Sequence, residues 1–233
     1  MAALQDQLID QVAERAAGRG VLLVGIAGAV AVGKSTLART IADGLQARGL
    51  AAQAVATDGF LRPNKELEAA GLNARKGFPE TFDVVAFHGF LDRLAAGRPA
   101  RMPVYSHVSY DIVPGETRTV AAKGVVIVEG VNVLQTAQAR ERFGLRLYVD
   151  AEPGHIKAWY LARLDGIIAN EPESLIAQIS DVAYRKTLIE AAWTGINLVN
   201  LRDHIAPTMA HADVVVRKAA DHSLVALVAL VAR

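Results

Sequence analysis

Gly28-Ala29-Val30-Ala31-Val32-Gly33-Lys34-Ser35 fits the phosphate-binding loop pattern G-x-x-x-x-G-K-[ST]. The apolar run Val21-Leu22-Leu23-Val24 precedes it and is typical of a buried strand, while residues 37–45 follow with helical spacing. In a strand-loop-helix arrangement of this kind, glycines let the loop turn its backbone N–H groups toward phosphate oxygens. The N-terminus of the helix adds a positive electrostatic field. The stretch predicts a nucleotide-binding loop, and the alternative is a glycine-rich turn with an incidental lysine.

Two side chains at the end of this loop carry its expected chemistry. Lys34 would reach the terminal phosphates of a nucleoside triphosphate, and the Ser35 hydroxyl would bind Mg²⁺. The loop by itself does not separate a kinase from a GTPase, an ATPase or a motor protein.

Composition sets limits on the class of protein. The 233 residues suffice for one domain over 1–233, with 52% hydrophobic and 21% charged residues. The net charge of +1 argues against a nucleic acid held by bulk charge, and there is no cysteine for disulfides or thiolate metal sites. The first residues do not resemble a secretion signal, and the apolar run 224–232 is too short to cross a bilayer. We therefore expect a cytoplasmic protein with no membrane partner.

Strands and helices are predicted to alternate along the chain. Residues 1–20 contain a helix whose apolar positions recur every four residues, as a core face or a subunit contact. Strands are expected at 21–24, 52–57, 125–128, 145–150, 212–217 and 224–232; helices are expected at 34–47, 64–70 with Asn64 as cap, 83–96, 153–168, and from 171 or 174 to 193. This alternation predicts an α/β fold of the P-loop NTPase type: a doubly wound, mostly parallel sheet with helices on both faces.

Residues 98–123 break this alternation. Three prolines, and the rings of Tyr105, His107 and Tyr110, lie in this segment. We expect an irregular insertion on the substrate side, with hairpin-like excursions that form a lid or a substrate wall.

Two acidic residues follow predicted strands. Asp58 follows the second strand, which we expect beside the first, so its carboxylate could accept the proton of an attacking hydroxyl. The alternative is an Asp-Gly turn in which Asp58 caps its own backbone. Glu129 follows the strand 125–128, where an acid associated with Mg²⁺ would lie; the alternative is a carboxylate bonded to a neighbouring loop.

A family resemblance narrows these possibilities. Pro103-Val104-Tyr105-Ser106-His107-Val108-Ser109-Tyr110-Asp111 resembles the P-V-Y-S-H-x-x-Y-D segment of bacterial type I pantothenate kinases, which are related to uridine kinase and phosphoribulokinase. Further matching pieces follow in the family's order: Gly28 to Thr36, Thr57 to Leu61 with Pro63-Asn64, Lys76 to Glu80, Val128 to Gln135, Tyr148 to Ala151, Trp159-Tyr160 with Arg163, Ile196-Asn197 with Asn200-Leu201, Pro207-Thr208, Lys218, and Asp221 to Ser223.

The resemblance implies an ATP-dependent kinase that phosphorylates pantothenate in the first step of coenzyme A synthesis. It implies catalytic roles for Asp58, Lys34 and Arg163, and Mg²⁺ ligation by Ser35 with support from Glu129. It places ATP on Gly28, Val30, Ala31, Val32, Gly33, Lys34, Ser35, Thr36, Lys218 and His222. It places pantothenate on Asp58, Tyr105, His107, Tyr110, Tyr160, Arg163 and Asn197. It also implies a homodimer, and feedback binding of coenzyme A through Arg39 and His107.

Side-chain chemistry alone leaves some of these roles open. His107 would as readily be a structural histidine. Trp159 and Tyr160 could both be core aromatic residues on a helix, and only Tyr160 is kept as a candidate.

The chain departs from the family at two places. Residues 1–20 are fewer than the family usually carries before its first strand, and residues 164–172 hold no aromatic where the family has several phenylalanines. The second departure leaves the acceptor open to another nucleoside or sugar hydroxyl. A further alternative is a nucleotide-binding regulator without transferase activity.

Overall fold

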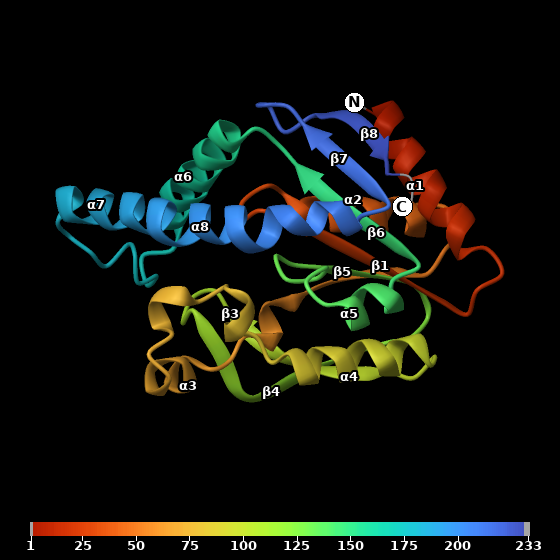
Figure 1. The fold of residues 1–233 in the computed structure, drawn as a ribbon, viewed down its shortest axis with the longest axis horizontal. Helices are drawn as coiled ribbons and strands as arrows, with labels where there is room; N and C mark the ends of the chain where they lie inside the picture. The colour runs from red at the N-terminus through yellow and green to blue at the C-terminus, as the bar shows by residue number, and fades with distance from the viewer. Residues whose placement is uncertain (1, 231–233) are drawn as a thin grey trace.

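The computed structural model describes residues 2–230, and its centre is a six-stranded sheet in the order β2-β5-β1-β6-β7-β8 (Figure 1). The strands are β1 (Val21–Gly28), β2 (Ala52–Ala56), β5 (Gly124–Glu129), β6 (Leu145–Asp150), β7 (Val214–Lys218) and β8 (Leu224–Ala229). All neighbours pair in parallel except β7 and β8, which are antiparallel. The predicted strand 224–232 is therefore present as far as Ala229, and its last two residues lie outside the described part of the chain.

The order of the strands corrects one expectation. β2 does not lie beside β1, because β5 is inserted between them and pairs with both. A parallel connection crosses over through a helix, so consecutive strands need not be neighbours. The continuous apolar run Val125-Val126-Ile127-Val128 fits this position, since a strand with neighbours on both sides and helices on both faces is buried throughout.

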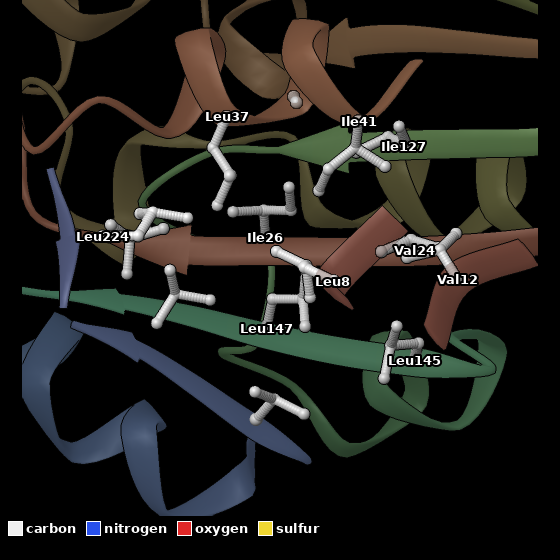
Figure 2. Close-up of a cluster of buried hydrophobic side chains, with 14 of the residues drawn as sticks. Leu8, Val12, Val24, Ile26, Leu37, Ile41, Ile127, Leu145, Leu147 and Leu224 are labelled. Atoms are coloured by element: carbon white, nitrogen blue, oxygen red, sulfur yellow. The ribbon is translucent and has the colours of Figure 1, made fainter. Parts of the chain in front are cut away.

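Helices cover both faces of the sheet, which confirms the predicted fold class. One face is covered by α1 (Ala2–Ala16) and α2 (Lys34–Ala47). Leu8 and Val12 of α1 and Ile41 of α2 pack in one core cluster with Val24 and Leu147 of the sheet (Figure 2). The apolar stripe of α1 is thus core within this chain. On the other face, α4 (Val84–Ala95), capped by Asp83, packs its phenylalanines with α5 (Ala137–Arg142), a short helix that the sequence did not predict.

Two shorter elements connect β2 to α4. The segment η1 (Thr57–Phe60) is a single 3₁₀ turn, and α3 is a short helix (Asn64–Ala69). Pro63 holds the cap position of α3, so the prediction that Asn64 caps this helix was wrong. Asn64 is instead the first residue of the helix, and its side chain bonds to Tyr110 and Lys76.

The insertion at 98–123 is more regular than expected. It forms an antiparallel hairpin of β3 (Ala100–Ser106) and β4 (Asp111–Val120) outside the main sheet. The hairpin-like excursion is confirmed, but the irregularity is confined to a register shift between Pro103 and Tyr105. Proline has no N–H for the strand ladder, so the pairing slips there.

A long helical arm follows the sheet strand β6. It contains α6 (Pro153–Asn170), α7 (Val182–Ala192) and α8 (Leu198–Asn200), with π-helical turns at Trp193–Asn197 and Leu201–Ile205. Figure 1 shows α7 and α8 as one continuous run. The second helix was expected to begin at 171 or 174, but it begins after Asp181, whose side chain accepts hydrogen bonds from Ala183 and Tyr184. Pro172 disfavours helical backbone at residue 171, and the Asp181 cap sets the observed start of the helix.

In the described residues 2–230, no helix is both long enough and apolar enough to cross a membrane.

Candidate active site

The phosphate-binding loop joins β1 to α2 and has the predicted form. Gly28 (φ 147°), Ala31 (φ 60°) and Gly33 (φ 91°) have positive φ angles. A Cβ on Gly28 would lie 2.6 Å from the carbonyl oxygen of Val149, so only glycine fits at this close approach. These turns and the start of α2 at Lys34 provide the concave set of N–H groups and the helix N-terminus that bind phosphate.

Lys34 is buried at the base of the loop. Its ammonium donates a 2.7 Å hydrogen bond to the carbonyl oxygen of Ala29, within the loop itself. Burial lowers the pKa of Lys34, and the carboxylates of Glu129 and Asp58 oppose that shift. The lysine is therefore held beside two acids, where a phosphate would add the negative charge that restores its usual pKa.

Ser35 and Glu129 meet at the end of β5. The Ser35 hydroxyl donates to the Glu129 carboxylate at 2.6 Å. Burial raises the pKa of Glu129, while Lys34 and the bond from Ser35 counter it. Mg²⁺ prefers oxygen ligands and usually takes one or two from protein beside phosphates and water, so this pair fits it. Among the described residues no cluster of three or more His, Cys, Asp or Glu could hold a metal.

Asp58 lies on the 3₁₀ turn η1, directly after β2. In the described part of the chain its carboxylate accepts no hydrogen bond, so the alternative of an Asp-Gly turn capping its own backbone is not what the structure shows. The neighbouring Gly59 lets the hairpin approach closely, since a Cβ there would lie 2.4 Å from the Pro103 carbonyl oxygen. The Asp58 carboxylate is left free to face the cleft.

One cleft of 880 Å³ brings most of the predicted residues together. Its lining includes Val30, Ala31, Gly33, Lys34, Ser35, Thr36, Arg39, Asp58, His107, Glu129, Trp159, Arg163, Lys218 and His222. A smaller cavity of 190 Å³ adjoins it, shares Asp58 and His107, and is also lined by Tyr105. Tyr110, Tyr160 and Asn197 line neither cavity and lie next to them.

The hairpin supplies an aromatic group beside Asp58. The Tyr105 ring lies 5.2 Å from the His107 ring and 6.1 Å from the Tyr110 ring, both edge-on. Tyr110 has a positive φ of 55°, which marks the turn between the two strands. Burial raises the pKa of Tyr105, and the Arg163 guanidinium opposes that rise, so the arginine lies within electrostatic reach of this group.

Tyr160, Arg163 and Asn197 come from the helical arm. Burial raises the pKa of Tyr160 and the nearby Asn197 side chain opposes that rise, and the Tyr160 ring packs 5.4 Å from the Trp193 ring. The Asn197 amide also donates to the Ala192 carbonyl oxygen at 3.3 Å. Arg163 is one helical turn beyond Tyr160 and lines the cleft, so the arm contributes one of its walls.

Lys218 and His222 line the cleft beside the phosphate loop, together with Trp159, an aromatic residue that the sequence prediction did not keep as a candidate. The Lys218 ammonium donates to the Val32 carbonyl oxygen at 3.0 Å. The His222 ring stacks on Trp159 with centroids 4.1 Å apart. Trp159 is buried as predicted, but it also lines the cleft. The Trp159-Tyr160 pair was a visible signal, and helical spacing alone could not show that both neighbours serve the site.

Lys76 is a second residue to which sequence reasoning gave no role. Its ammonium donates to Asn64 Oδ1 at 2.6 Å and to the Tyr110 carbonyl oxygen. It lies 5.2 and 4.9 Å from the ring centroids of Tyr105 and Tyr110. Burial lowers its pKa, and Asp111 and Asp58 oppose that shift. The matching piece Lys76 to Glu80 was the available signal, but only the fold brings it to the hairpin.

A phosphate-binding loop, a serine–glutamate pair and a free carboxylate in one cleft of a parallel sheet define a P-loop kinase that acts on a small molecule. The chain belongs to the Phosphoribulokinase / Uridine kinase family, whose model matches residues 23–164.

The relatives agree with this class. The chain is 44% identical over 221 residues to a pantothenate kinase of Streptomyces avermitilis, covering 87% of this chain and 67% of the relative. It is 39% identical to a pantothenate kinase of Streptococcus suis, covering 87% and 70%.

Solved structures share the fold. A putative fructose transport system kinase from Silicibacter sp. superposes with a TM-score of 0.70 at 27% identity, covering 85% of this chain and 92% of that one. D-glycerate 3-kinase from Cryptococcus neoformans superposes with a TM-score of 0.68 at 13% identity, covering 98% of this chain and 99% of that one. At this identity the likeness shows the fold alone.

Proposed function

We propose that this kinase transfers the γ-phosphate of ATP to the primary hydroxyl of pantothenate, the first step of coenzyme A synthesis. One observation carries the proposal. The uncapped carboxylate of Asp58 faces the same cleft as Lys34 and Arg163, between the phosphate loop and the Tyr105 hairpin. Relatives that are 39 to 44% identical to this chain are named pantothenate kinases, and this supports pantothenate as the acceptor.

The residues suit this transfer chemically. Asp58 would orient the attacking hydroxyl and accept its proton as the new P–O bond forms and the bond to ADP breaks. Lys34 and Arg163 would neutralise the charge on the transferring group from two sides. The Tyr105 hairpin and the Tyr160–Asn197 pair would line the acceptor, since an asparagine amide can both donate to and accept from an amide and carboxylate ligand.

Several finer roles belong to the same proposal. Mg²⁺ would be held by Ser35 with support from Glu129, and would supply charge neutralisation at the phosphates. Lys218 and His222 would lie near the adenine, and Gly28 to Thr36 would hold the phosphates. Coenzyme A would act as a feedback inhibitor through Arg39 and His107, both of which line the cleft. We also propose a cytoplasmic homodimer, which gel filtration tests.

A second acceptor class has one observation in its favour. Residues 164–172 contain no aromatic side chain, whereas the resemblance implies a phenylalanine wall around the acceptor tail. Aliphatic residues would make a pocket of different shape, which could suit another small hydroxyl compound. The likeness to a protein described as a putative fructose transport system kinase agrees with a sugar as that compound.

The deciding experiment measures ADP release by the purified chain with pantothenate, uridine, ribulose 5-phosphate and simple sugars, each against an acceptor-free control. We expect release that depends on pantothenate. Release with another acceptor and none with pantothenate would overturn the choice of acceptor. ATP binding without release for any acceptor would favour a regulator instead.

A further inference from the structure

Asn200 is a buried amide with no role in the site described above. It ends α8, between the two π-helical turns, and is 6% exposed. Its Nδ2 donates a 2.8 Å hydrogen bond to the carbonyl oxygen of Gly77, which is 123 residues away in sequence. Its Oδ1 is buried and has no partner among the described residues.

Gly77 belongs to the turn that carries Lys76. Gly77 has a φ of 97°, and its N–H donates to the Thr81 hydroxyl at 3.0 Å. That hydroxyl in turn donates to the Phe78 carbonyl oxygen at 2.7 Å, and the Phe78 side chain is buried. Asn200 therefore bonds a turn that is already braced on its other side, and fixes it against the helical arm.

The turn continues into the wall beside Asp58. Lys76 is the neighbour of Gly77, and its ammonium reaches Asn64 Oδ1 and the Tyr110 carbonyl oxygen. The Asn64 N–H donates to Asp111 at 2.9 Å, which ties the same wall to the start of β4. A chain of hydrogen bonds thus runs from Asn200 through the Lys76 turn to the tip of the hairpin.

The opposite wall begins on the same helical run as Asn200. Asn197 precedes it by three residues, so the two amides are neighbours on one helical turn. Asn197 lies beside Tyr160 on α6, whereas Asn200 donates a hydrogen bond to the Lys76 turn. The two asparagines therefore hold two different walls from a single helical segment.

We infer that Asn200 is a positioning residue for the acceptor: its bond to Gly77 sets the distance between the Lys76–Tyr110 wall and the Tyr160–Asn197 wall. This inference rests on the proposed function, because it takes the space between these walls as the place of the attacking hydroxyl. The phosphate loop has no part in this chain of bonds. Loss of Asn200 therefore weakens acceptor binding and leaves nucleotide binding unchanged.

Asn200→Asp tests this with almost no change of shape, because it replaces the donor by an oxygen that faces the Gly77 carbonyl oxygen. Asn200→Leu is the second variant, and it removes both the donor and the unpartnered acceptor, so it serves if the aspartate does not fold. The matched control is Gln46→Glu, which removes the same kind of amide-to-carbonyl bond, to Ala52, at the exposed end of α2.

Steady-state kinetics gives the first readout. We expect the KM for the acceptor to rise about tenfold or more in either Asn200 variant, with kcat within about threefold and the affinity for a non-hydrolysable ATP analogue unchanged. Gln46→Glu should match the wild type. An unchanged KM for the acceptor, or an equal loss of ATP-analogue affinity, would overturn the inference.

Hydrogen exchange gives a readout that needs no acceptor. Amides of residues 73–82 should exchange at least about fivefold faster in Asn200→Asp, while those of the phosphate loop keep the wild-type rate. Unchanged exchange in residues 73–82 would contradict the positioning role. Because this result does not depend on pantothenate, it separates failure of the inference from failure of the proposed function.

Discussion

The Ser35 hydroxyl donates a 2.6 Å hydrogen bond to the Glu129 carboxylate, across 94 positions of the sequence. The bond joins the start of α2 to the carboxyl end of β5, the strand that separates β1 from β2. With Asp58 directly after β2, residues from the ends of three neighbouring strands lie at one edge of the sheet, where open α/β sheets bind their ligands.

Glu129→Gln removes a negative charge and keeps an oxygen that can accept the Ser35 bond. We expect the Mg²⁺ concentration for half-maximal activity to rise about tenfold, because a neutral amide is a weaker ligand for a hard cation. Thermal unfolding should show no loss of stability, since burial already disfavours the charged form of Glu129. Glu141→Gln, at an exposed position of α5, is the control; an unchanged Mg²⁺ dependence in Glu129→Gln would remove this residue from the metal site.

Asp58→Asn keeps the shape of the side chain but cannot accept a proton. We expect kcat to fall by about two orders of magnitude or more while ATP still binds, because the carboxylate acts on the hydroxyl and not on the nucleotide. Single-turnover measurements with an ATP-analogue titration test both parts. Asp43→Asn, exposed on α2, is the control. Full activity in Asp58→Asn would show that another group takes the proton.

Gly28→Ala should destabilise the protein by about 2–3 kcal/mol, because alanine is strained at a φ of 147° and its Cβ would meet the Val149 carbonyl oxygen. Gly89→Ala is the contrasting change. Gly89 lies within α4 and faces open space where the new methyl group would lie, so alanine there should stabilise by about 0.5–1 kcal/mol. Urea unfolding measures the change in stability of both variants. Equal changes in the two would show that the loop does not require glycine at position 28.

Asp213→Asn tests a link between β6 and β7 that depends on pH. Burial favours a higher pKa for Asp213, but hydrogen bonds from the Arg146 guanidinium and N–H outweigh it and leave the pKa below its usual value. The folded pKa is lower than the unfolded one, so the bond stabilises above about pH 4 and loses its effect as pH falls through the folded pKa.

We expect Asp213→Asn to lower the free energy of unfolding by about 1–2 kcal/mol at pH 7 and by much less near pH 3. Urea unfolding at both pH values measures this difference. Asp203→Asn, in an exposed pair with Arg202, should change nothing measurable at either pH. If Asp213→Asn lowers the free energy of unfolding equally at both pH values, the pH dependence argued here is wrong.

Coenzyme A should inhibit this chain less than it inhibits a relative with phenylalanines after the arginine that corresponds to Arg163. The reason is that residues 164–172 offer no aromatic surface for the thiol end of the inhibitor. Inhibition constants measured side by side at equal ATP check this. Equal constants for the two proteins would mean that aliphatic side chains replace the aromatic wall.

The sequence by itself determined the phosphate loop, the strand that precedes it and the helix that follows it. These are local features, because the G-x-x-x-x-G-K-[ST] spacing specifies its own turn, and the apolar run and helical spacing specify their own elements. The same holds for Glu129, which ends the apolar strand β5, and for the alternation that predicted the fold class.

The tertiary structure alone decided the order of the strands and the assembly of the acceptor side. Nothing local tells that β5 separates β1 from β2, because a crossover helix permits either order. Three contacts join segments that are far apart in sequence: Lys76 with Tyr110, Trp159 with His222, and Asn200 with Gly77. Their closeness comes from how the hairpin and the helical arm pack around the sheet, which no periodicity within either segment records.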